Sequence, residues 1–180
     1  MHTLAANAVD IGYPGRSVIQ GLSLEVLAGE FTVIVGPNAC GKSTLLRSLG
    51  RMLPPTAGQV LLDGKSIQSY PTKEVARRVG LLPQSPTTPD AITVADLVSR
   101  GRYPHQKLLR QWSPADAEAV DRSLREVGML EHSERMVDEL SGGQRQRVWI
   151  AMTLAQETPI VLLDEPTTFL DVVHQIDVLD

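Results

Sequence analysis

Cysteine is nearly absent from this sequence: Cys40 is the single one among 180 residues. An intramolecular disulfide therefore cannot form, which fits a reducing compartment. No apolar run approaches the roughly 18 residues that a membrane-spanning helix needs. The first residues, 1–7, lack the cationic start and apolar stretch of a secretory signal. We therefore expect a cytoplasmic protein that reaches a membrane only by docking on another protein.

Basic residues are not in excess, since 17 Lys and Arg face 21 Asp and Glu, for a net charge of -4. A protein that grips nucleic acid needs a basic surface to neutralise phosphates, so the composition disfavours that partner. Hydrophobic residues make up 42% of the chain and charged residues 21%, which is typical of a globular protein. The length suits one domain of ordinary size.

Turn residues divide the chain into short apolar strands and amphipathic helices. Their alternation predicts an α/β fold with a largely parallel sheet that is covered on both faces. The stretch 91–139 changes to helical patterns and predicts a mainly helical insertion. Strands are predicted within 4–26 and at 31–35, 60–62, 65–67, 79–82 and 160–163, and helices at 43–49, 72–78, 115–127 and 144–156.

Residues 36–43 read Gly-Pro-Asn-Ala-Cys-Gly-Lys-Ser and match the phosphate-loop pattern G-x-x-x-x-G-K-S. The pattern follows a predicted strand and precedes a predicted helix, a context that a chance glycine turn would lack. Glycines let backbone N–H groups point at phosphate oxygens, and the helix start adds a positive dipole end. Lys42 supplies charge for the terminal phosphates, and the Ser43 hydroxyl can ligate Mg²⁺. The loop predicts binding of a nucleoside triphosphate.

Two adjacent carboxylates, Asp164 and Glu165, follow the apolar stretch 160–163. In a parallel sheet the carboxyl end of such a strand faces the ligand crevice. One carboxylate can hold the hydrated Mg²⁺, and the other can orient or deprotonate the attacking water. Solvated acids are common at strand ends, so the pair takes its meaning from the phosphate loop upstream.

The segment 140–144, Leu-Ser-Gly-Gly-Gln, allows two interpretations. Ser141 and Gln144 fit the S-x-x-Q capping box of a helix N-terminus. A plain cap does not account for Gly142 and Gly143, because glycines are costly at a helix start. Bare amides at a positive helix end make a good anion site. We therefore favour phosphate binding over a plain cap.

The chain resembles the nucleotide-binding subunits of ABC transporters over essentially its whole length. Segment 140–144 carries that family's own signature and separates it from other phosphate-loop ATPases. The resemblance implies a phosphate-loop ATPase core with a parallel sheet, an N-terminal antiparallel β part and a helical insertion. The likeness rests on the order of the segments 36–43, Gln84, 140–144, Asp164–Glu165 and Leu170–Asp171.

The resemblance divides the chain into a first part of the ATP-binding core at 1–86, a helical signature subdomain at 87–146 and a second core part at 147–180. It places a switch histidine after a further strand beyond Asp171, and the chain stops before that point. We therefore expect a truncated core, in which the strands at 31–35 and 160–163 each lack a central neighbour. His174 lies too soon after Asp171 and is interpreted as structural.

Individual roles also follow from the resemblance. Tyr13 would stack on adenine, although an ordinary strand or turn tyrosine is the alternative. The signature of one subunit would complete the site of a second copy, so that two ATP molecules lie in a head-to-tail dimer. The implied catalytic residues are Glu165 as general base, Lys42, and Gln84 as γ-phosphate sensor. The implied ligands of Mg²⁺ are Ser43, Gln84 and Asp164. The implied ATP contacts are Tyr13, Gly36, Pro37, Asn38, Ala39, Cys40, Gly41, Lys42, Ser43, Thr44, Ser141, Gly142, Gly143, Gln144 and Asp171.

Segments outside these motifs are similar to the ATPase subunits of bacterial ferric-siderophore importers, and most to the ferric enterobactin type. This implies a translocating ATPase on the cytoplasmic face of the inner membrane, bound to permease subunits and acting indirectly with a siderophore-binding protein. The alternatives are import of haem or cobalamin, a soluble ABC-type ATPase acting on nucleic acid or ribosomes, and an inactive truncated fragment. The segments are 101–106, 112–113, 148–152, 154–158 and 174–177.

Two further features carry predictions. Ala39 stands where many relatives have glycine, and alanine would cost about 1 kcal/mol if the position needs a positive φ. The stretch 96–112 has four Lys or Arg residues against one acid, and we predict that it contacts a permease helix through residues that include Arg100 and Arg102.

Overall fold

The computed structural model describes residues 3–27, 29–106 and 112–166. The chain divides into two compact units. The first consists of residues 1–81 and 159–164, and the second of residues 82–158 and 165–180. Each unit carries a different part of the predicted motifs, and the units are described separately.

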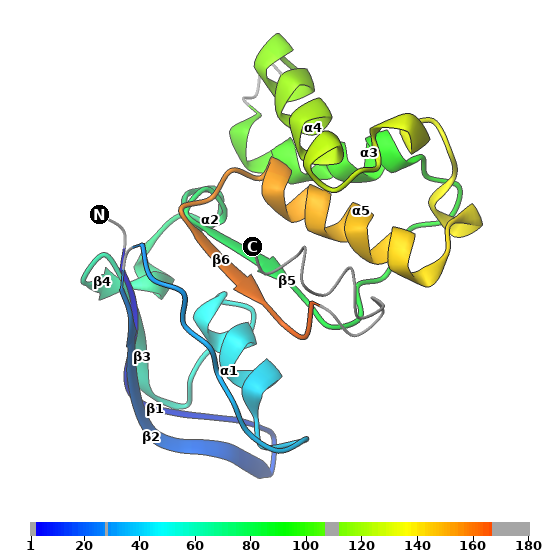
Figure 1. The fold of residues 1–180 in the computed structure, drawn as a ribbon. Coiled ribbons are helices and arrows are strands. Elements are labelled where there is room, and N and C mark those ends of the chain that lie inside the picture. The colour runs from blue at the N-terminus through cyan, green and yellow to red at the C-terminus, as the bar shows by residue number, and fades with distance from the viewer. Residues whose placement is uncertain (1–2, 28, 107–111, 167–180) are drawn as a thin grey trace. The chain divides into compact units, whose positions relative to one another are not determined.

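An antiparallel sheet dominates the first unit (Figure 1). Its strands β1 (Leu4–Tyr13), β2 (Arg16–Val26), β3 (Ala57–Leu62) and β4 (Lys65–Ser66) lie in the order β2-β1-β3-β4. The turn between β3 and β4 consists of Asp63 and Gly64, which have φ of 51° and 74°, as a primed turn requires. A short 3-10 helix, η1 (Ile67–Ser69), follows β4.

Helix α1 (Lys42–Leu49) packs against β1 and confirms the helix predicted after the phosphate loop. Leu45, Leu46 and Leu49 are buried, because their spacing places them on one side of the helix. Gly50 ends α1, and its N–H donates to the Leu46 carbonyl at 2.8 Å. The same core takes in buried side chains from the sheet, namely Leu4, Ala6, Val9, Ile11, Val60 and Leu62.

The first unit also contains a small second sheet. Helix α2 (Thr72–Ala76) leads into β5 (Val79–Leu82), which pairs with β6 (Ile160–Leu163). The two strands run in the same direction (Figure 1), so this pair is the predicted parallel element. Ile160 and Leu162 are buried. Val161 is exposed, which corrects the prediction that β6 is covered on both faces.

The apolar run Phe31–Val35 forms no strand, and that prediction is wrong for this chain. The side chains of Phe31, Val33 and Val35 are 75%, 64% and 88% exposed. A β-prone segment becomes a strand only where neighbours accept its backbone hydrogen bonds. Within the described ranges no strand pairs with this run, and β6 has β5 as its only neighbour. Both segments therefore lack the central neighbour, as predicted, and the first loses its strand conformation as well.

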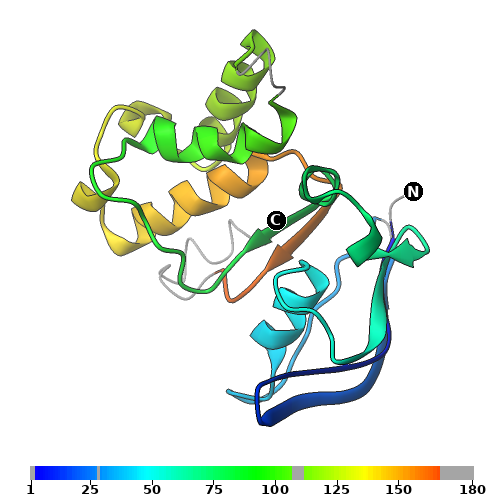
Figure 2. The same ribbon diagram turned by 180° about the vertical axis from the view of Figure 1, so that it is seen from behind.

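The second unit is helical, as predicted for the insertion (Figure 2). Helices α3 (Val94–Ser99) and α4 (Pro114–Glu126) pack on α5 (Gly142–Ala155) and on each other. The connections hold three short 3-10 helices: η2 (Arg100–His105), η3 (Leu130–His132) and η4 (Val137–Glu139). None of the described helices is long and apolar enough to cross a membrane.

Helix α4 corresponds to the helix predicted at 115–127 and begins with Ser113 as cap and Pro114 in the first turn. Ser113 and Asp116 form a reciprocal capping box. Helix α5 differs from prediction in one respect, because the expected subdomain boundary at 146/147 falls inside this continuous helix. The structure assigns all of α5 to the second unit, since α5 packs against both α3 and α4. The division into core and signature subdomain remains a prediction for the complete protein.

Candidate nucleotide-binding site

The phosphate loop is shaped by residues with positive φ. Ala39 has a φ of 62°, so the condition under which alanine is strained is met, at a cost of about 1 kcal/mol. Gly41 has a φ of 106°, and a Cβ there would lie 2.9 Å from Val18 Cγ1. Both the conformation and the close approach of the neighbouring strand therefore require glycine at position 41.

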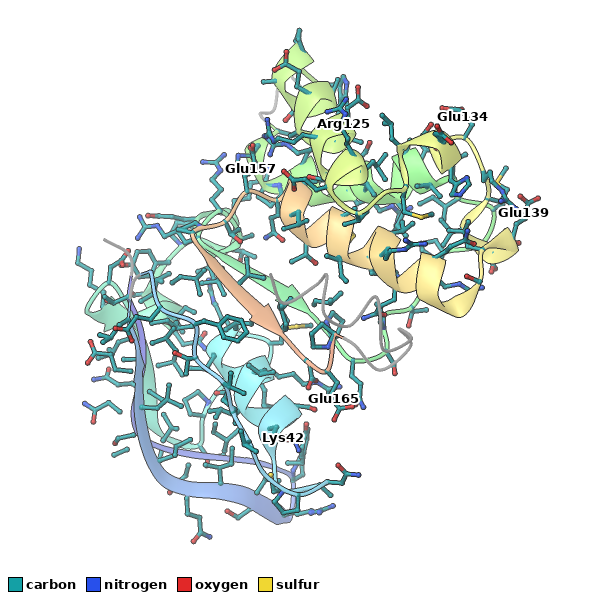
Figure 3. The ribbon with its side chains drawn as sticks, in the orientation of Figure 1. Lys42, Arg125, Glu134, Glu139, Glu157 and Glu165 are labelled. Atoms are coloured by element: carbon teal, nitrogen blue, oxygen red, sulfur yellow. The ribbon has the colours of Figure 1, made fainter. Side chains whose placement is uncertain are left out.

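Lys42 opens α1 and folds back over the loop (Figure 3). Its Nζ donates to the carbonyl oxygens of Gly36 and Pro37, at 2.9 and 3.0 Å. The residue before the helix, Gly41, offers no side-chain cap, and the first turn holds no acidic residue. The positive end of α1 is therefore not neutralised by the helix's own side chains, which suits an anion such as phosphate.

Ser43 and Asp164 meet although 121 positions separate them in the sequence. The Ser43 hydroxyl donates to Asp164 Oδ1 at 2.9 Å. Asp164 is only 4% exposed at the end of β6. The structure therefore brings together two of the three predicted Mg²⁺ ligands, a hydroxyl and a carboxylate. Oxygen ligands of this kind are those that Mg²⁺ prefers.

Tyr13 lies at the end of β1 and is partly exposed. Its hydroxyl accepts a hydrogen bond from Arg47 Nη1 at 3.4 Å. A hydrogen bond with Thr44 is the main cause that lowers the pKa of Tyr13; burial opposes it, and Arg47 adds to the lowering. The side chain is thus tied to α1. The stacking of Tyr13 on adenine stays a prediction. Arg47 was not predicted from the sequence, because it belongs to no recognisable motif.

Gln84 and Glu165, both in the second unit, form a direct pair. Gln84 Nε2 donates to Glu165 Oε2 at 2.6 Å. Glu165 has a φ of 51°, a left-handed conformation that is uncommon outside glycine and clusters at functional sites. This turn of the backbone interrupts the side-chain alternation of β6 directly after Asp164. The predicted sensor and the predicted base are therefore in contact.

The signature segment forms the capping box at the start of α5. Ser141 Oγ accepts from the Gln144 N–H at 3.2 Å, and Gln144 Oε1 accepts from the Ser141 N–H at 3.1 Å. The first of the two interpretations is therefore correct as geometry. It leaves the glycines unexplained, because a Cβ at Gly142 would meet nothing within 4 Å. Packing among the described residues does not require glycine at position 142, and phosphate binding there stays a prediction.

The sequence pattern of the ABC transporter family matches residues 19–168. The chain belongs to the ABC transporter family.

Relatives in this family include the ferric enterobactin transport ATP-binding protein of Escherichia coli K12. It is 55% identical over 177 residues, which is 98% of this chain and 65% of that protein. The petrobactin import ATP-binding protein FpuD of Bacillus anthracis gives the same identity and the same coverage. A bacterial Atm1-family ABC exporter solved with ATP bound has a TM-score of 0.84 at 31% identity, covering 98% of this chain and 31% of that one. The chain thus spans about 65% of the length of these two transport proteins.

Two other residues of this ABC transporter chain change the sequence-based account. Arg102 is only 5% exposed, so its assignment to a permease-contacting surface is wrong. Its positive charge pairs inside the unit with Asp116 and Glu157. Gln146, which no motif singled out, is buried and donates to the Pro166 carbonyl at 3.0 Å, directly after Glu165. Two of the four basic residues of stretch 96–112, Lys107 and Arg110, lie outside the described residues, as do Leu170, Asp171 and His174.

An open hollow lies on the second unit beside Arg102. Its volume is about 630 Å³. Tyr103 and Trp112 contribute exposed aromatic surface, and Arg100 contributes an exposed charge. The hollow is lined by Asp96, Ser99, Arg100, Tyr103, Gln106 and Trp112.

Proposed function

We propose that the complete protein binds and hydrolyses ATP as the energy-coupling subunit of an importer for iron–siderophore complexes. The observation that carries the ATPase assignment is the hydrogen bond between Ser43 and Asp164, which joins the phosphate-loop helix to the end of β6. The cargo assignment rests on the relatives named for ferric enterobactin transport and petrobactin import. The cargo itself would not touch this subunit.

The residues at the phosphate loop fit Mg²⁺ and the phosphates of ATP. Ser43 and Asp164 would hold the metal with hard oxygen atoms. When bound, Mg²⁺ neutralises charge on the phosphate oxygens. Lys42 already directs its ammonium at the oxygens of Gly36 and Pro37, and it can exchange these carbonyls for phosphate oxygens. The uncapped start of α1 adds the N–H groups of its first turn.

Glu165 is the group that would accept the proton of the attacking water. Attack on the γ-phosphorus forms one P–O bond and breaks the bridging P–O bond to the β-phosphate, while the proton passes to the Glu165 carboxylate. Gln84 donates to Oε2 of that carboxylate and orients it. Phosphoryl transfer depends mainly on positioning and charge, so this restraint contributes directly to the rate.

A second copy of the subunit and a permease would complete the transporter. The open space around Gly142 supports a role of the signature toward a partner, because no atom of residues 3–27, 29–106 or 112–166 would lie within 4 Å of a Cβ there. The capping box holds the first turn of α5 rigid while the glycines leave its backbone approachable. The hollow beside Tyr103 and Trp112 offers aromatic surface to a permease segment on the cytoplasmic face of the membrane.

Substitutions in the complete subunit test the ATPase assignment. Glu165→Gln keeps an oxygen that accepts from Gln84 but loses the base, so ATP binding should persist while hydrolysis falls by about 10² or more. Lys42→Ala should abolish productive ATP binding. Glu134→Gln is the matched control, since Glu134 is an exposed acid of the second unit (Figure 3), and it should hydrolyse ATP like the wild type. Equal hydrolysis by Glu165→Gln and wild type would remove Glu165 from the role of base.

The cargo assignment needs a separate measurement. The subunit would be assembled with its permease and binding protein in vesicles, and ATP-dependent uptake of ferric enterobactin, haem and cobalamin would be compared. Uptake of the siderophore complex alone supports the proposal. Uptake of haem or cobalamin in its place would overturn the cargo assignment and leave the ATPase assignment intact.

A further inference from the structure

The turn η2 has two sides with different surroundings. Arg100 and Tyr103 line the hollow, and both are exposed. Between them, Gly101 and Arg102 are buried. A six-residue 3-10 turn is thus shared between a surface open to a partner and the interior of the helical unit.

Arg102 fixes the inner side of this turn to both long helices. Its Nε donates to Asp116 Oδ1 in the first turn of α4, at 2.9 Å. Its Nη1 donates at 2.7 Å to the carbonyl of Ala155, the last residue of α5, and at 2.6 Å to Glu157 Oε2. The guanidinium therefore bridges the start of one helix and the end of the other.

His105 repeats the contact one turn further on. Its Nε2 lies 2.8 Å from the carbonyl oxygen of Gln156, an atom that only accepts, so the ring nitrogen is the donor. Gly101 brings the two backbones together: a Cβ there would lie 2.3 Å from the Met152 carbonyl oxygen. The side chains of Arg102 and His105 thus bind the end of α5, and the absence of a side chain at Gly101 lets the two backbones approach.

The far end of α5 carries the signature. The helix runs for 14 residues from Gly142 to Ala155, which corresponds to a rod of about 21 Å. The carbonyls of Ala155 and Gln156 at its C-terminal end are bound by Arg102 and His105 of η2. The N–H groups of its first turn, at the other end, belong to the signature segment that begins at Leu140. A displacement of η2 must be followed by α5, because hydrogen bonds weaken steeply when stretched and a buried guanidinium tolerates no lost partner.

We propose that Arg102 and His105 are positioning residues. When a permease segment binds in the hollow and displaces η2, these two side chains would move α5 with it and so change the position of the signature at its other end. Arg102 is buried, and both side chains bind carbonyl oxygens at the end of α5, so they would act through this helix. The inference rests on the proposed function and adds to it the path by which the permease would regulate ATP hydrolysis. It assigns the coupling to Arg102, whose charge was expected at a permease-contacting surface, and to His105, which carries no role in the sequence motifs.

The test uses the complete subunit, alone and assembled with its permease in phospholipid vesicles. Arg102→Lys keeps the charge, but its one nitrogen replaces two donor atoms, Nε and Nη1, which the planar guanidinium holds at fixed positions toward Asp116 and toward Ala155 and Glu157. His105→Ala removes only the contact to Gln156. Arg122→Ala is the control. Arg122 is exposed and contacts Glu157, and among the described residues it contacts neither η2 nor the carbonyls at the end of α5. Basal ATPase activity, ATP affinity, melting temperature and stimulation by the permease are measured for each.

We expect permease stimulation to fall at least about fivefold in Arg102→Lys and by a smaller factor in His105→Ala. Basal activity and ATP affinity of the isolated subunits should stay within about twofold of the wild type, as should every property of Arg122→Ala. Should Arg102→Lys fail to fold, His105→Ala decides alone. Wild-type stimulation in the folded variants, or basal and stimulated activity that fall in proportion, would overturn the inference. A wild-type subunit that the permease does not stimulate would overturn the inference together with the proposed function.

Discussion

Replacing Arg102 by Met in the complete subunit is the most direct measure of what holds the helical unit together. The change keeps an extended, largely apolar stem but removes the donors to Asp116, Ala155 and Glu157. Asp116 is then left buried with only the hydrogen bonds of Ser113. Removing one partner of a buried ion pair costs about 3–5 kcal/mol. Since a domain is stable by about 5–15 kcal/mol, the loss is a large share of the total.

Urea unfolding followed by circular dichroism measures this cost. Arg100→Met is the matched control, because the same residue types are exchanged two positions earlier at an exposed site, and it should change the free energy of unfolding by about 0.5 kcal/mol or less. Adding Asp116→Asn to Arg102→Met should recover part of the loss, since the buried carboxylate is no longer left without its partner. If Arg102→Met costs no more than Arg100→Met, the buried network is not a stabilising element and the reasoning fails.

Three other predictions concern pH, a thiol and the isolated chain. Burial raises the pKa of Asp116, but hydrogen bonds from Ser113 and Arg102 outweigh it and lower the pKa overall. The stability that this carboxylate contributes should therefore be fully present above its unfolded pKa, near 4, and should be lost as pH falls through the lower folded pKa. Urea unfolding of wild type and Asp116→Asn at several acidic pH values would measure this loss. Alkylation of the exposed Cys40 should block ATP binding by the complete subunit, and Mg-ATP should protect it; an alkylation rate unchanged by saturating ATP would contradict this. A polypeptide of residues 1–180 alone should aggregate and turn over little ATP, because the apolar run Phe31–Val35 is exposed, and a soluble, cooperatively melting, active product would refute this.

Local patterns in the sequence predicted most elements and the principal contacts of the candidate site. The turn at Asp63 and Gly64, the cap at Ser113 and the stop at Gly50 are each determined by a few neighbouring residues. Phosphate-loop and acidic motifs identified Ser43 and Asp164, which the fold brings into contact. The rule that strand ends face the ligand crevice placed the carboxylates near the phosphate loop, and the family resemblance implied that Asp164 and Ser43 share one Mg²⁺.

What the sequence could not show depends on non-local surroundings. The run Phe31–Val35 has strand composition, but a strand needs neighbours, and composition does not reveal whether they are present. Charge counting placed Arg102 on a surface with Arg100, although only the fold distinguishes an arginine that faces solvent from one buried against Asp116. Gln146 likewise lies in a motif-free helical stretch, and its contact with the Pro166 carbonyl appears only in three dimensions.

The grip of η2 on α5 has a consequence for how this helix can change over evolutionary time. Arg102 and His105 bind main-chain oxygens of Ala155 and Gln156, so these hydrogen bonds do not depend on the side chain at either position. Drift by substitution at Gln156 should leave the grip intact. Insertion or deletion of one residue in α5 is different, because it turns the helix end by about 100° and shifts it by about 1.5 Å. We therefore expect lineages descended from this protein to vary in the residues of the last turn while holding the length from Ser141 to Gln156 fixed.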